Sequence, residues 1–152
     1  MMRSLRLACA VIVCVAGCDA KRYSPTPLIT TATIDVYAVS ASPVPGAKKA
    51  TDPETTTPIF LVTPAIISTA DVATVQRTKG SPESLTVNLT PAGASKLTAA
   101  TSKPAGMQAA FVVNGTVLSA PKVMSPLSSG FRITSNVIAN NSEQIFSALT
   151  GK

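Results

Sequence analysis

The stretch from Gln108 to Pro121 constrains the fold of this chain more than any other. It reads Gln-Ala-Ala-Phe-Val-Val-Asn-Gly-Thr-Val-Leu-Ser-Ala-Pro. The continuous apolar run Ala109–Val113 predicts a strand covered on both faces, near the middle of a sheet. Asn114-Gly115 is a strong β-hairpin signal, so a returning strand is expected over Thr116–Leu118. Pro121 has no backbone N–H and ends that strand at a sheet edge.

Further strands are predicted where short apolar runs alternate with polar residues. They are expected over Thr33–Val39, Ile59–Val62, Ser84–Thr90 and Phe131–Thr134. The third has the clearest pattern, because Leu85, Val87 and Leu89 share one face of the strand. The segment Ser40–Pro58 is rich in proline and predicts a mobile loop.

Two helices are predicted in the middle of the chain. The first is expected over Ala70–Thr78, with Thr69 as its cap and a glycine after its end. The second begins at Pro91 behind the cap Thr90, since proline suits the first helical position. It runs to about Lys103. Its buried side is expected to carry Ala94, Leu97 and Thr101.

A closing helix is predicted from the cap Asn141, with Gln144 completing a capping-box-like pair. Its apolar side comprises Ile145, Phe146 and Leu149. Strands and helices are interleaved with uneven spacers, and at least one hairpin is present. The pattern therefore predicts an α+β fold, with a mixed or antiparallel sheet and about three helices packed mainly on one face.

The N-terminus has the pattern of a targeting segment. Arg3 and Arg6 precede the short apolar run Leu7–Val15, and small residues then lead to Cys18. The apolar run is about half the length that a membrane-spanning helix needs. Export of the chain is therefore expected.

The four residues Val15-Ala16-Gly17-Cys18 resemble a bacterial lipobox, in which the chain is cut between Gly17 and Cys18 and the cysteine is lipidated. This divides the chain into a signal peptide (1–17), a lipidated cysteine with its tether (18–32) and a domain (33–152). A lipid anchor would hold the domain on the periplasmic or outer side of a membrane in the bacterial cell envelope. The alternative is an ordinary secretory signal cleaved near Ala20.

Several kinds of site are excluded by composition. The chain has no His, and loss of residues 1–17 with lipidation of Cys18 leaves no free thiol, so Ser-His-Asp, Cys-His and His or Cys metal sites are not expected. Cofactors and small-molecule substrates are not expected either. The same cleavage lowers the net charge from +6 to +4, and the basic residues form no stripe with aromatics, which argues against nucleic-acid binding.

One motif suggests catalysis and is set aside. Ser119-Ala-Pro-Lys122 fits the S-x-x-K signature of penicillin-binding proteins and β-lactamases. In those enzymes the serine opens a helix, whereas here it follows a predicted strand and Pro121 interrupts the spacing. The chain is therefore expected not to be an enzyme.

The segments Leu85–Leu97, Gln108–Pro121 and Phe131–Thr134, with Thr101 between them, carry a family pattern. In this order and spacing, with Gly-x-Val-x-Ser-Ala-Pro at the centre, they resemble the head of the first periplasmic domain of SecD, a membrane component of the protein-export machinery. The similarity extends from about Thr33 to Gly151. Ser68-Thr69 and Ser135 depart from it, because the family has glycine at these two places, and glycine would permit a positive φ.

The resemblance implies a SecD-head-like fold and a module that binds exported polypeptides or Sec components. Asn114, Gly115 and Lys122 are the candidate binding surface. SecD has transmembrane helices that this sequence lacks, so the chain is not expected to act as a translocation motor. The alternative hypothesis is a structural envelope lipoprotein that reuses the fold without a role in export.

Overall fold

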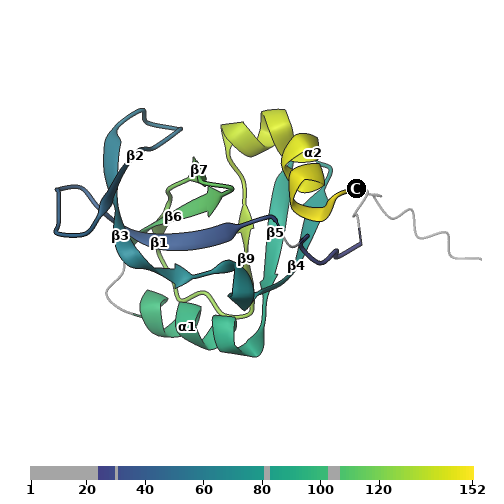
Figure 1. Cartoon of the computed structure of the whole chain (residues 1–152), viewed down its shortest axis with the longest axis horizontal. Coiled ribbons are helices and arrows are strands. Elements are labelled where there is room, and N and C mark those ends of the chain that lie inside the picture. The colour runs from purple at the N-terminus through teal and green to yellow at the C-terminus, as the bar shows by residue number, and fades with distance from the viewer. Residues whose placement is uncertain (1–23, 30, 81–82, 103–106) are drawn as a thin grey trace, which may run out of the picture.

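The computed structural model describes residues 24–29, 31–80, 83–102 and 107–152. Within these ranges the chain forms two antiparallel sheets and two α-helices, so the α+β class is confirmed (Figure 1). The signal peptide, Gly17 and Cys18 lie outside the described residues. Among the described residues, no helix combines the length and the hydropathy that crossing a bilayer requires.

The larger sheet contains the hairpin. Its strands are β1 (Ile34–Ser40), β2 (Lys48–Thr51), β3 (Pro58–Ile67), β6 (Met107–Val113), β7 (Thr116–Ser119) and β8 (Lys122–Val123). Their order is β2-β3-β1-β6-β7, and β8 also pairs with β6. The segment predicted as one loop over Ser40–Pro58 therefore includes a strand, β2. It forms because Lys48–Thr51 pairs antiparallel with the first half of β3.

Strand β6 is buried on both faces, as its apolar run predicts. Ala109, Phe111 and Val113 enter the main core, whereas Ala110 and Val112 enter a second cluster on the other side of the sheet. Neighbouring strands flank β6 on both edges. β7 is an edge strand of this sheet, and it ends at Ser119, two residues before Pro121.

The smaller sheet corrects the first predicted helix. It has the order β4 (Val72–Thr78), β5 (Ser84–Leu89) and β9 (Gly130–Ile133), so Ala70–Thr78 is largely a strand. Only the 3-10 turn η1 (Thr69–Asp71) precedes it. Four of the seven residues of β4 are β-branched, and Val75 and Arg77 alternate into the interior when β4 pairs with β5.

Helix α1 (Pro91–Thr101) begins as predicted. The hydroxyl oxygen Oγ1 of Thr90 accepts a hydrogen bond from the Gly93 amide at 3.2 Å, and Pro91 occupies the first turn. Leu97 and Thr101 are buried, but Ala94 is only half-buried and Gly93 takes its place against the rest of the domain. The expected end near Lys103 falls outside the described residues.

Helix α2 (Asn136–Thr150) begins earlier than predicted. Ser135 is its cap, because its Oγ accepts a hydrogen bond from the Ile138 amide at 3.2 Å and donates one to the Leu118 carbonyl at 3.0 Å. Asn141 lies at a kink that joins two helical segments, with φ −135° and ψ 16°, so a helical segment does begin after it as predicted, but α2 as a whole begins at Asn136. Asn141 donates a side-chain hydrogen bond to the Val137 carbonyl.

The two departures from the family pattern need no glycine. Thr69 stands at the first of the two glycine positions and is not among the described residues with a positive φ, and Ser135 has φ −153°, so neither position requires glycine. Thr69 is the first residue of η1, and its Oγ1 accepts a hydrogen bond from the Ile34 amide at 3.1 Å, whereas Ser135 is the N-cap of α2. A hydroxyl at these places adds a hydrogen-bonding group that glycine lacks.

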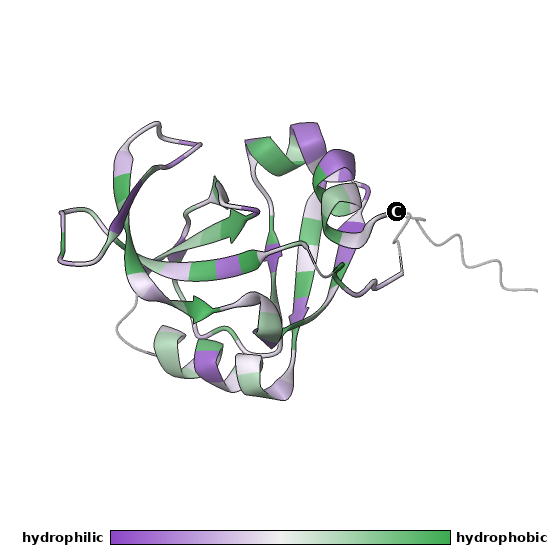
Figure 2. Ribbon diagram, viewed as in Figure 1, coloured by the Kyte–Doolittle hydropathy of each residue, from purple (hydrophilic) through white to green (hydrophobic). Residues whose placement is uncertain are grey.

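Both helices lie over one core. Leu97 of α1 and Ile138, Phe146 and Leu149 of α2 pack with residues of both sheets, and none of the described helix residues enters the second cluster. Hydrophobic residues recur along the strands where the sheets meet (Figure 2). The expected placement of helices on one face of the larger sheet is thus confirmed, although two helices form rather than three.

Candidate functional site

Two of the predicted surface residues form the hairpin turn. Asn114 has φ 47° and Gly115 has φ 80°, the left-handed conformations that an Asn-Gly turn requires. Asn114 also holds the start of β1. Its backbone N–H donates to the Thr33 carbonyl at 3.0 Å, and its side-chain Oδ1 accepts from the Thr33 backbone N–H at 2.9 Å. These bonds give Asn114 a structural role.

The third predicted residue, Lys122, lies elsewhere. It is exposed on β8 and pairs with Gln108 near the start of β6, whereas Asn114 follows the end of β6. The two points are six residue steps apart along the strand direction, or about 20 Å. The three residues therefore do not form one compact surface.

A groove lies beside the hairpin instead. Its hollow of about 310 Å³ runs between β6–β7 and α2, and we call it the hairpin groove. The described residues that line it are Val113, Asn114, Thr116, Leu118, Val137, Asn141, Gln144, Ile145 and Ala148. Asn114 is the one residue of the predicted surface that reaches it.

The groove has apolar inner surfaces. Val113 and Leu118 come from the hairpin and are 5% and 3% exposed. Val137, Ile145 and Ala148 come from the side of α2 next to the stripe Ile138, Phe146 and Leu149, which fills the main core. Helix α2 thus carries two adjacent apolar stripes: one fills the core, and the other lines the groove while Val137 and Ile145 also pack against the core.

Amide side chains form the rim of the groove. Asn141 and Gln144 are exposed on α2, and Asn114 lies across from them on the hairpin. All the described residues that line the groove are uncharged. Apolar walls with a few polar groups are typical of sites that bind apolar ligands or peptide segments.

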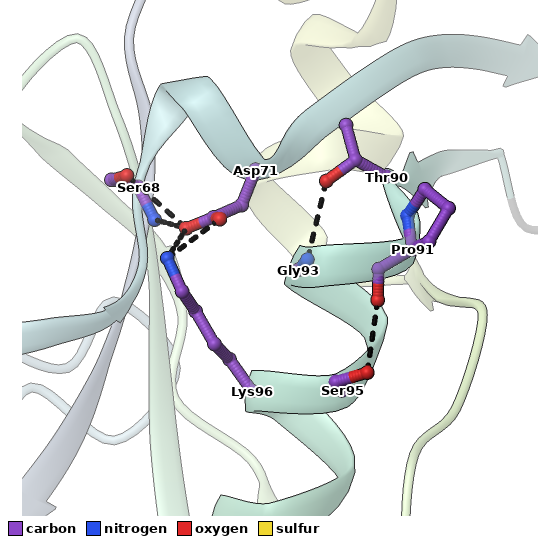
Figure 3. Close-up of polar contacts among 7 residues, drawn as sticks. All are labelled: Ser68, Asp71, Thr90, Pro91, Gly93, Ser95 and Lys96. Atoms are coloured by element: carbon purple, nitrogen blue, oxygen red, sulfur yellow. Dashed lines mark hydrogen bonds and ion pairs between the residues drawn. The ribbon is translucent and has the colours of Figure 1, made fainter.

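The best-connected carboxylate lies away from the groove. Asp71 is 5% exposed, and Lys96 Nζ donates to its two oxygens at 2.8 and 3.1 Å (Figure 3). The Ser68 amide donates to the same carboxylate at 3.1 Å. The hydrogen bond from Lys96 lowers the pKa of Asp71 below 3.8, and those from Ser68 add to it, whereas burial opposes the shift. Asp71 links η1 to α1 through these hydrogen bonds, so its carboxylate has a structural role.

The S-x-x-K motif has no catalytic geometry. Ser119 ends β7 and is 3% exposed, and Lys122 belongs to the next short strand rather than to a helix turn. In the part of the chain that the structure describes, no cluster of three or more His, Cys, Asp or Glu side chains is suited to hold a metal ion.

The sequence pattern did not reveal the α2 side of the groove. The sequence pattern groups Ile145 with Phe146 and Leu149, yet only the latter two are buried. A spacing signal existed, since Val137, Asn141, Ile145 and Ala148 recur at helical intervals beside the core stripe. The spacing was missed because the helix was predicted to start at Asn141, which leaves Val137 outside it.

The comparisons with known proteins agree with this fold. Residues 46–151 match the family described as SecDF, P1 head subdomain. No curated protein sequence matches the chain.

Two solved structures of SecDF have the same fold. One is described as a membrane component that enhances protein export, with a TM-score of 0.56, 17% identity and coverage of 77% of this chain and 61% of that one. The other is SecDF in a super-membrane-facing form, with a TM-score of 0.57, 18% identity, and coverage of 77% of this chain and 18% of that one. The chain thus spans less than two thirds of either. With most of its length matched, the chain belongs to the SecDF P1 head subdomain family.

Proposed function

We propose that this protein is a non-enzymatic, membrane-anchored module of protein export that binds exported polypeptides in the hairpin groove. The single observation that carries the proposal is a groove with apolar walls and an uncharged amide rim, set in a SecDF head fold. An apolar stretch of an unfolded chain would lie against Val113, Leu118 and Ile145. The rim amides would hydrogen-bond to its backbone.

The neighbouring strand supports this kind of ligand. β7 is at the edge of the larger sheet and forms one wall of the groove. An edge strand offers backbone groups to an extended peptide, while a groove beside it accepts side chains. A small rigid molecule would use only the second of these features.

The anchor places the module at the membrane. The P1 head of SecDF is part of a periplasmic domain, and we propose the same side of the membrane for this chain, held by lipid on Cys18. Mass spectrometry of the membrane-bound protein tests this step, because an unmodified N-terminus would contradict it.

Site-specific crosslinking tests the binding function. A photo-crosslinking residue at Gln144, on the rim, should capture exported polypeptides or Sec components in cells. Lys122 is the matched control, since it is also exposed but lies near the opposite end of β6. Ile145→Ala, which shortens one wall, should reduce the products from Gln144.

Equal products from Gln144 and Lys122, or no polypeptide from either, would contradict the binding proposal. A deletion strain that secretes normally but has an altered envelope would favour the structural alternative.

A further inference from the structure

The sequence predicts a tether over residues 18–32, but part of this segment already packs against the domain. We call residues 24–29 the N-terminal strap. Thr26 is 6% exposed and forms a β-bridge with Val75 of β4, with its amide and carbonyl each hydrogen-bonded to Val75 at 2.8 Å. The Ile29 amide donates to the Leu149 carbonyl of α2 at 2.9 Å. The strap thus fixes the chain to the smaller sheet and to the last turn of α2.

This attachment shortens the free part of the tether. Between a lipidated Cys18 and Thr26 lie only residues 19–25. Eight Cα–Cα steps reach at most about 29 Å when fully extended. A flexible chain of this many residues spans about 15 Å on average.

The domain is larger than this reach. A chain the size of residues 26–152 has a radius of gyration of about 14 Å, which corresponds to a diameter of about 35 Å. The strap and the C-terminus lie at one end of the longest axis, and β2 lies at the other (Figure 1). The far end therefore cannot reach the membrane without the strap leaving its place.

We propose that the strap orients the domain on a lipid surface. The end formed by Thr26, β4 and the last turn of α2 faces the lipid headgroups, and β2 points away from the bilayer. This inference rests on the lipid anchor at Cys18 in the proposed function. It adds a membrane-facing surface that the groove does not include.

The sequence allows a clean labelling experiment. Cys9 and Cys14 lie in the segment removed with the signal peptide, and Cys18 is acylated, so an introduced cysteine is the sole free thiol of the anchored protein. Lys152→Cys marks the strap end and Lys49→Cys marks β2. Both lysines are exposed. Each variant carries a fluorophore and is reconstituted as the lipidated protein in vesicles with a short-range quencher on the lipid headgroups.

We expect the label at residue 152 to lose most of its fluorescence and the label at residue 49 to lose little. Equal quenching, or stronger quenching at residue 49, would overturn the proposal. Mass spectrometry on the same vesicles separates the two failures. An unacylated chain contradicts the anchor, whereas wrong quenching of an acylated chain contradicts the orientation alone.

A longer tether provides the control. Insertion of a flexible Gly-Ser segment of about 20 residues between Ala20 and Lys21 leaves the strap and the fold unchanged. It should double the average reach of the tether to about 30 Å, so that the two labels become similarly quenched. A difference that survives the insertion would show that the short tether is not its cause and would overturn the proposal.

Discussion

Helices α1 and α2 pack on the same core but differ in their surroundings. In α1, a Cβ added to Gly93 would lie 2.6 Å from the Asp71 carbonyl oxygen, so the helix meets η1 at backbone contact. Lys96 and Thr98 add hydrogen bonds to Asp71 and Leu127. Helix α2 is kinked at Asn141 and borders three hollows, of about 390, 340 and 310 Å³, whereas α1 borders one, of about 560 Å³, among the hollows of the described residues.

This difference suggests different roles for the two helices: α1 supports the fold, whereas α2 also borders the proposed binding groove. The N-terminal part of α1 is closed by backbone contact with η1 at Gly93, and its charged pair is used within the fold. The described residues that line the hollow beside α1 have small side chains, among them Ala94, Ser95 and Ala99, and form no large apolar wall.

Helix α2 uses one stripe for the core, and its second stripe, in which Val137 and Ile145 are half-buried against the same core, borders the hairpin groove. We therefore expect substitutions in α1 to affect stability, and substitutions on the second stripe of α2 to affect binding.

The largest stability effect is expected at Leu97. It is 1% exposed on α1, so Leu97→Ala should lower the free energy of unfolding by about 2–5 kcal/mol. Ile145→Ala on the half-exposed stripe of α2 should cost only about 1 kcal/mol. Urea unfolding of both variants measures the contrast. Equal losses would remove the distinction between the two helices.

Close packing at Gly93 should give the next largest effect. Gly93→Ala places a methyl group 2.6 Å from backbone oxygen, and the helix must shift away from η1. We expect a loss of about 1–3 kcal/mol, even though alanine favours helices over glycine. Ser95→Ala, on the exposed side of α1, is the control and should change stability by less than about 0.5 kcal/mol. A stabilised Gly93→Ala variant would show that the contact can relax.

The Asp71–Lys96 pair should give a smaller, pH-dependent effect. Asp71→Asn should cost about 1 kcal/mol at neutral pH, because Lys96 is exposed and regains water. The pKa of Asp71 is lowered in the folded state, so its stabilisation is present above pH 3.8 and is lost as the pH falls from there through the folded pKa.

Unfolding measured at several pH values should therefore show that wild type and Asp71→Asn converge below pH 3.8. A gap that stays constant into this range would mean that the charge of Asp71 contributes little.

The smallest stability effect is expected at Asn141. Asn141→Ala removes the side-chain hydrogen bond to Val137 but adds helix propensity, so stability should change by less than about 0.5 kcal/mol. Because Asn141 lines the hairpin groove, crosslinking of polypeptides from Gln144 should fall. Unchanged crosslinking would place the ligand away from the kink.

The sequence correctly predicted those elements whose structure depends on a single short segment. The hairpin was predictable from Asn114-Gly115, since a tight turn spans four residues and its left-handed conformation depends on the two in the middle. The start of α1 followed from Thr90-Pro91, because a cap and its acceptor are three residues apart. The burial of β6 on both faces followed from its unbroken apolar run.

The errors arose where a partner far along the chain decided the structure. Residues 72–78 form β4 because β5 and Thr26 pair with them. Helix α2 begins at Asn136 because Ser135 bonds to Leu118 across the domain as well as to Ile138. Neither partner is visible in a local window of sequence.

The sequence by itself determined the α+β class, the SecD-head resemblance and the strand–turn–strand of the hairpin, because these depend on periodicity and short-range backbone preferences. Only the tertiary structure decided the division into two sheets, the hairpin groove and the attachment of the strap. Each of these needs segments far apart in the chain to meet, and their pairing energy is set by burial and hydrogen bonds between them rather than by either segment alone.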